Sequence, residues 1–245
     1  MIQDIKTIWH LVTPNPGQDH QSRLEHFYKR QASHYDQFRK RLLPGRPDLF
    51  YQLNQHQPQG KWLDVGAGTG SSLDFLNDSQ IKAYDKIILL DLSPSLIQKA
   101  QVKIEKRKLN NVQCQLVDIH DLNTEQKFDL ITLSYALTMM PLWPLVLEKV
   151  YALLQTGGLI GVVDFYISDK HPSFHLKKHS AWQRNFWPIW FSSIMFILTA
   201  IICPIYAPTM KRWSYLKAQL SCPCCPLAKS PTTGLLAKKG NPVRP

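Results

Sequence analysis

The segment Asp64–Gly70, of sequence D-V-G-A-G-T-G, is the part of this sequence best suited to bind a ligand. Glycine lacks a Cβ atom and adopts positive φ readily, so a turn with three glycines lets backbone N–H groups approach a bound molecule closely. The dinucleotide fingerprint G-x-G-x-x-G would place its third glycine at position 71, which is Ser71. The spacing therefore disfavours an NAD-binding oxidoreductase, while other nucleotide ligands stay open.

Two further carboxylates follow apolar runs downstream of this turn. Asp91 ends the run 86–90, and Asp118 follows the run 112–117. In nucleotide-binding α/β folds, an acid at the end of the second strand accepts hydrogen bonds from ribose hydroxyls. Asp91 is therefore predicted to face the ribose of a nucleoside-containing ligand.

Apolar runs and turn signals predict the elements that would position these residues. A helix is expected to begin at Ser71, and another is expected from Ser93-Pro94 to Arg107, where serine is an N-cap and proline the first helical residue. Gly157-Gly158 is expected to form a turn before a last strand. Strands are predicted over 61–63, 86–91, 112–117, 128–135 and 159–165. The sequence therefore predicts an α/β, Rossmann-like fold with a mostly parallel sheet flanked by helices.

In order and spacing, the segments from 61 to 165 resemble class I S-adenosylmethionine (SAM) methyltransferases, with D-x-G-x-G-x-G as their first motif. The resemblance implies that SAM is the cofactor, with Asp64 near its methionine end, Asp91 at its ribose and Asp118 at its adenine amino group. No metal is predicted, because the cysteines at 222–225 have no second ligand pair or histidine nearby, as a zinc site usually needs. The cofactor-binding residues that it implies are Asp64, Gly66, Ala67, Gly68, Gly70, Asp91, Leu92, Asp118, Ile119 and Ser134.

Two outer blocks narrow the resemblance to one group of these enzymes. The first runs from Asp19 to Arg46 and contains D-H-Q-S-R-L-E-H-F-Y, and the second runs from Val162 to Phe191. Together they resemble the N-methyltransferases of betaine-lipid synthesis over about residues 8–193. That resemblance implies threefold methylation of the amine of diacylglyceryl-homoserine, giving its trimethyl form. It also implies a helical cap (1–55) over the cofactor site of a SAM-binding domain (56–193).

No catalytic residue is assigned, because methyl transfer to a neutral amine needs alignment more than a base. Tyr28, Tyr35 and Tyr135 are candidates for the acceptor site, because aromatic rings favour a cation that grows with each methylation. His120 is a candidate proton acceptor. Arg23, Arg39 and Arg46 could meet an acceptor carboxylate. Packing in the core or solvation at the surface stays an open alternative for each.

Charge and cysteine usage bear on the compartment and partners. The net charge is +11, and residues 194–245 carry seven Lys+Arg and no acid, so most of the excess belongs to the tail and does not indicate a nucleic-acid partner. Five cysteines without a secretion signal predict a reducing, cytoplasmic location, and Cys114 is expected to pack within a strand. The expected partner is a lipid or small amine, with peripheral contact at the inner face of the membrane.

Two other functions stay open at this point. A small-molecule or quinone-type SAM methyltransferase would share the same cofactor domain. A non-catalytic SAM-binding module could instead be anchored in the membrane by the long uncharged stretch 186–207. The oligomeric state and the number of methyl transfers are not predicted.

Residues 194–245 depart from the resemblance, because nothing in them alternates like the antiparallel sixth and seventh strands that close such sheets. We expect these strands to be missing or irregular and this basic, Pro- and Cys-containing tail to be disordered or translated out of frame. Codons permitted by Ala228–Lys239, read from their third base, can encode K-V-P-Y-Y-W-F-I-G-K-K, which has the pattern of a strand. The same operation on Ser193–Tyr206 can encode D-N-V-Y-L-N-S-D-H-L-P-Y-L-R.

Resequencing of the gene should therefore find a one-base slip just after Ser193. Restoring the frame is expected to yield both recovered segments in one continuous reading. An intact open frame through Ser193 in the genomic DNA would contradict the hypothesis.

Overall fold

A computed structural model describes residues 45–56, 59–140, 142–165, 213–216 and 232–239, together with Leu43, Lys170, 180–182 and 184–185. The helices are α4 (Arg46–Gln55), α5 (Asp78–Lys82), α6 (Pro94–Arg107) and α7 (Trp143–Leu153), with 3₁₀ segments η1 (Ser71–Phe75) and η2 (Leu137–Met139). The strands are β1 (Gly60–Val65), β2 (Tyr84–Asp91), β3 (Val112–Leu116), β4 (Phe128–Ser134), β5 (Leu154–Phe165), β6 (Trp213–Leu216) and β7 (Thr232–Lys239).

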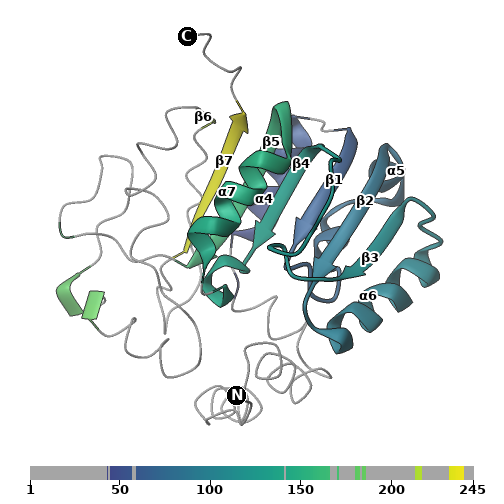
Figure 1. Cartoon of the computed structure of the whole chain (residues 1–245), viewed down its shortest axis with the longest axis horizontal. Helices are drawn as coiled ribbons and strands as arrows, with labels where there is room; N and C mark the ends of the chain where they lie inside the picture. Colours follow the sequence, from purple (N-terminus) through teal and green to yellow (C-terminus); the bar gives the residue numbers. More distant parts are fainter. Residues whose placement is uncertain are drawn as a thin grey trace.

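The strands form one sheet in the order β3-β2-β1-β4-β5-β7-β6. The first five are parallel, and β7 runs antiparallel to both β5 and β6. In Figure 1, α7 lies in front of the sheet and α4 behind it. The predicted α/β, mostly parallel fold is confirmed.

Alternating side chains divide the core between the two faces of the sheet. On β1, Trp62 packs in a cluster with α4, α5 and α6, whereas Leu63 packs in a cluster with α7. Ile87 and Ile88 divide in the same way on β2. Both faces of the parallel strands are therefore buried, which explains their nearly continuous apolar sequences.

The helix α6 begins and ends close to where the sequence predicts. Ser93 is its N-cap, since the hydroxyl Oγ accepts the Leu96 N–H at 3.4 Å, and Pro94 takes the first turn. The helix ends at Lys108, which has the left-handed φ of 53°. The residues that cap the helix therefore account for where it begins and where it ends.

The helix expected to begin at Ser71 takes a different form. Residues Ser71–Phe75 are a short 3₁₀ helix, and α5 begins separately after Asn77, which forms a capping box with Gln80. Similarly, the expected turn at Gly157-Gly158 lies inside β5, where the register to β4 shifts between Phe128 and Leu130. Between the ladder pairs of Phe128 and Leu130, β5 has three more residues than β4, so the chain leaves the regular ladder here, with Gly157 at φ 81°.

The expectation that strands six and seven are missing is wrong. β7 pairs with β5 from Leu159↔Lys238 to Phe165↔Thr232, so it covers the outer edge of the parallel sheet. The ammonium of Lys239 also donates to the carbonyls of Tyr151 and Leu154, at 2.9 and 2.7 Å, and lies over the Tyr151 ring. These carbonyls belong to the end of α7, where a cation complements the helix dipole. β7 is therefore joined both to the sheet and to a helix.

Burial affects the chemistry of Cys114 on β3. The residue is partly buried against the α4-side cluster, and this burial raises the pKa of its thiol to about 11. The thiol therefore stays protonated at neutral pH, in keeping with the packing role predicted from the sequence.

Several predicted features lie outside the described residues. They include the cap helix with Tyr28 and Tyr35, the anchor stretch 186–207 and the cysteines at 222–225. Within the described ranges, none of the helices combines the length and apolarity needed to cross a bilayer.

Candidate functional site

The glycine turn leaves β1 at the point where the order of strands reverses. β1 lies between β2 and β4, and the chain reaches β2 and β3 on one side before crossing to β4 on the other. In open parallel sheets, ligands bind outside the carboxyl ends of the strands at such a switch point. The predicted residues at 64–70, 91–92, 118–119 and 134–135 lie in or just after the carboxyl ends of β1, β2, β3 and β4.

Backbone hydrogen bonds join the turn to the end of β2. The N–H groups of Gly66 and Ala67 both donate to the Leu90 carbonyl, at 2.8 and 3.0 Å. The Gly68 N–H donates to the carboxylate Oδ2 of Asp91 at 2.7 Å. The turn is therefore held against the neighbouring strand before any ligand binds.

The conformation of the turn requires glycine. Gly66, Gly68 and Gly70 have φ values of 69°, 58° and 66°. A Cβ atom on Gly66 would lie 2.6 Å from the Cβ of Ala136, in the loop after β4. The loops after β1 and β4 thus approach more closely than side chains allow, and the glycines form a cradle that a Cβ atom would fill.

The partly buried carboxylate of Asp91 accepts hydrogen bonds from the backbone on both sides of it. Its Oδ2 accepts from Gly68 and its Oδ1 accepts the Ser93 N–H at 2.9 Å. An ionised carboxylate offers several acceptor positions and can accept from more than one donor at once. The chemistry expected for a ribose therefore fits this residue.

Asp64 and Ser134 lie deeper than Asp91. The Asp64 side chain is 1% exposed, and its Oδ1 accepts the hydroxyl of Thr132 on β4 at 2.6 Å. Ser134 is 2% exposed at the end of β4. Leu92, which follows Asp91, is partly buried. The carboxylate of Asp64 therefore lies within the sheet and not at the protein surface.

The predicted residues in the turn after β3 differ in how deeply they are buried. The Oδ1 atom of Asp118, which is partly buried, accepts the His120 N–H at 2.8 Å. Ile119 is 2% exposed and packs in the α7-side core, whereas His120 is exposed. Only the backbone of Ile119 and the carboxylate of Asp118 are therefore available for the predicted adenine contact.

Tyr135 directly follows β4 and adopts an unusual backbone conformation. Its φ is 56°, in the left-handed region that non-glycine residues rarely adopt. The Tyr135 N–H donates to the Val163 carbonyl at 2.7 Å, and its side chain, 5% exposed, belongs to the α4-side cluster. The structure thus places this acceptor-site candidate beside the glycine turn but largely within the core.

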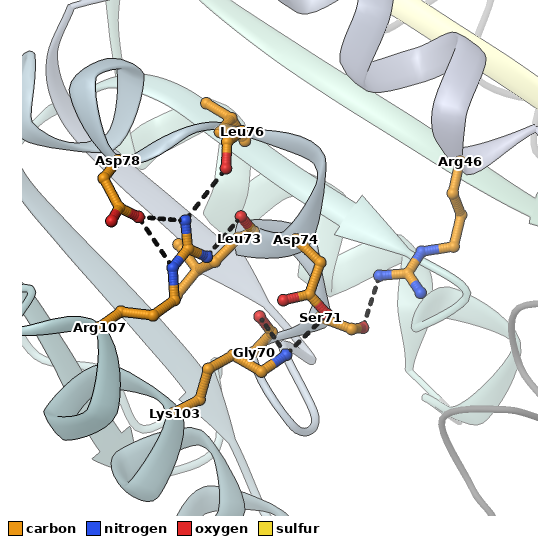
Figure 2. Close-up of polar contacts among 9 residues, drawn as sticks. All are labelled: Arg46, Gly70, Ser71, Leu73, Asp74, Leu76, Asp78, Lys103 and Arg107. Carbon is orange, nitrogen blue, oxygen red and sulfur yellow. Dashed lines mark hydrogen bonds and ion pairs between the residues drawn. The ribbon is translucent and has the colours of Figure 1, made fainter.

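Arg46 lies at the same turn, a place that its sequence position alone did not reveal. The guanidinium, on the first residue of α4, donates to the Ser71 hydroxyl at 2.7 Å (Figure 2). It also lies 5.1 Å from the centroid of the Phe75 ring. The residue is 4% exposed. The structure therefore places Arg46 against the residues that follow Gly70 in the turn.

Two cations of α6 hold the same segment from another side (Figure 2). Lys103 contacts the Gly70 carbonyl at 3.3 Å and the Asp74 carboxylate at 2.8 Å. Arg107 donates to the carbonyls of Leu73 and Leu76 and forms an ion pair with Asp78 at 2.6 Å. Sequence analysis missed these contacts, because they join residues about thirty positions apart and no local pattern marks them.

Comparison with known proteins finds similarity to methyltransferases. The Methyltransferase domain family matches residues 56–215. A demethylmenaquinone methyltransferase of Geobacillus sp. (strain WCH70) is 26% identical over 151 residues, covering 58% of this chain and 63% of that protein. Malonyl-[acyl-carrier protein] O-methyltransferase 1 of Ilyobacter polytropus is 26% identical over 148 residues, covering 58% and 52%. The chain thus spans less than two thirds of the length of these relatives.

Solved structures share the fold at low sequence identity. A DhpI–SAH complex aligns with a TM-score of 0.57 and 17% identity, over 96% of this chain and 97% of that one. The N-methyltransferase NodS of Bradyrhizobium japonicum WM9 aligns with a TM-score of 0.53 and 13% identity, over 80% and 95%.

Close packing at the turn predicts how a substitution there affects stability. We expect Gly66→Ala to lower the free energy of unfolding by about 1–3 kcal/mol, because the new Cβ would meet Ala136 at an unfavourable φ. Ala136→Gly should remove the clash but not the backbone strain, so the two changes should couple. Chemical denaturation of both single variants and the double variant measures this coupling. Strict additivity would contradict the described contact.

Proposed function

This chain belongs to the methyltransferase-domain family, and from that premise we propose that it is a SAM-dependent N-methyltransferase acting on the amine of a lipid headgroup. The observation that carries the cofactor assignment is the glycine cradle joined to Asp91 by the Gly68 N–H. The lipid acceptor is supported by the sequence blocks at both ends of the cofactor domain. Its proposed form is diacylglyceryl-homoserine, methylated to the trimethyl lipid.

In this proposal the residues of the chain hold the cofactor at three places. The Asp91 carboxylate binds the ribose hydroxyls, and Asp118 binds the adenine amino group. Asp64 lies at the methionine end, below the glycine turn. When bound, SAM supplies a methyl group on a positively charged sulfur. The solved structures of similar fold include complexes with SAH and with SAM, which supports the cofactor as part of the proposal.

Alignment of the amine with that methyl group would supply much of the acceleration. Holding two reactants in line contributes about 7–11 kcal/mol in the best intramolecular reactions. Desolvation lowers the pKa of an amine and so favours the neutral, nucleophilic form. Tyr28, Tyr35 and Tyr135 are proposed to line the acceptor end, with His120 as a candidate proton acceptor. A lipid acceptor would bring the enzyme to the inner face of the membrane as a peripheral protein.

A second candidate is a quinone-type methyltransferase. It is supported by the similarity to demethylmenaquinone methyltransferases, of which one is 26% identical over 151 residues. The two candidates share the cofactor site and differ in the acceptor atom, which is nitrogen in the first and carbon or oxygen in the second.

Calorimetry with SAH (S-adenosylhomocysteine) and with NAD tests the cofactor. We expect the chain to bind SAH and not NAD, and Asp91→Asn to weaken SAH binding at least about tenfold, because hydrogen bonds to a charged group contribute about 1.5–3 kcal/mol. Asp85→Asn is a matched control, since Asp85 is exposed near the other end of β2. Binding of NAD, or equal affinity of the two variants, would contradict the cofactor site.

Lipid analysis by mass spectrometry tests the acceptor. Cells that make diacylglyceryl-homoserine and express this chain should accumulate the trimethyl lipid, with the mono- and dimethyl forms as intermediates. The Asp91→Asn variant is the control for background methylation. If instead the methyl group appears on a quinone and no methylated betaine lipid forms, the second candidate function is supported and the first is wrong.

A further inference from the structure

Three polar side chains lie in a row below the glycine turn. Trp62 and Asp64 are two residues apart on β1 and so lie on the same face, and Asp64 is in register with Thr132 on β4. The indole Nε1 of Trp62 lies 2.7 Å from the Thr132 hydroxyl, which lies 2.6 Å from Oδ1 of Asp64. All three are buried, with exposed fractions of 0%, 0% and 1%.

The direction of these hydrogen bonds follows from their chemistry. An indole N–H can only donate, so the Thr132 oxygen accepts from Trp62. A hydroxyl carries one proton, and among the described residues Asp64 is the acceptor that this hydroxyl meets, so the proton points to Oδ1. Trp62 thereby fixes the hydroxyl as a donor to the carboxylate. A donor to an ionised carboxylate stabilises the charged form.

The carboxylate that receives this hydrogen bond opens the glycine motif. Gly66, whose N–H donates to the Leu90 carbonyl on β2, is only two residues beyond Asp64, so the carboxylate directly precedes the start of the turn. A buried carboxylate at this edge complements a cationic ligand group, and a charge-assisted hydrogen bond to it is short and strong. In the cofactor proposed above, the α-ammonium of the methionine moiety is such a group.

We propose that Thr132, oriented by Trp62, is a positioning residue that holds the Asp64 carboxylate ready for the α-ammonium of the cofactor. This inference rests on the proposed function and extends it to two residues that do not touch the ligand. The arrangement would favour ligands that carry an amino-acid end over nucleosides that lack one.

Two probes separate this role from a general effect on the fold. SAH contains the amino-acid moiety, and 5′-methylthioadenosine keeps the adenosine and sulfur but lacks that moiety. Thr132→Val keeps the shape of the side chain and removes the hydroxyl. We expect this change to weaken SAH binding by about tenfold to a hundredfold, as for the loss of a hydrogen bond to a charged group, with methylthioadenosine affinity almost unchanged.

Two further variants complete the test by calorimetry. Thr132→Ser retains the hydroxyl and should restore SAH affinity. Trp62→Phe leaves the Thr132–Asp64 bond possible but unoriented, so it should weaken SAH selectively and by less than Thr132→Val. If Thr132→Val does not fold, Thr132→Ala is measured with the same two probes.

The possible outcomes lead to different conclusions. Equal weakening of both probes in Thr132→Val, or unchanged SAH affinity, would overturn the positioning role while the cofactor assignment stands. If the unaltered protein binds neither probe, both the proposed function and this inference are wrong. Selective loss of SAH affinity with recovery in Thr132→Ser supports the role.

Discussion

The hydrogen bond from the Gly68 N–H to Asp91 is the interaction on which the rest of the site depends. It joins the turn after β1 to the end of β2, and the same carboxylate accepts the N–H of Ser93, the N-cap of α6. The ammonium of Lys103, on α6, donates to the carbonyl of Gly70. Hydrogen bonds thus connect the turn, β2 and α6 to one another, so a shift of any one of them would break contacts with the other two.

The short 3₁₀ segment after the turn needs outside support. Segments of this kind have poorer hydrogen-bond geometry than α-helices and leave carbonyls available. Arg107 contacts the carbonyls of Leu73 and Leu76, while Arg46 holds the Ser71 side chain from α4. A rigid cradle loses less conformational entropy when a ligand binds, so cations that hold this segment in place would favour binding.

Sequence reasoning succeeded where the determining chemistry is local. The cap Ser93, the following proline and the glycine spacing act within a few residues, and they correctly predicted α6 and the turn. Prediction failed where the structure of a segment depends on partners far away in the sequence. The residues 232–239 do not alternate as an exposed-edge strand would, but β5 offers an unpaired edge that accepts them. Likewise, no pattern around Arg46 reveals that its partner lies at Ser71.

The place of β7 has a consequence for how this chain folds during synthesis. β5 is complete once residue 165 has been made, but the strand that covers its outer edge ends at Lys239. Until then the ribosome carries a nascent chain with an open parallel sheet, and exposed edges of this kind pair readily with other chains. The end of α7 also lacks the ammonium of Lys239 during this interval. Completion of the sheet is therefore a late step that follows translation of the C-terminal strand.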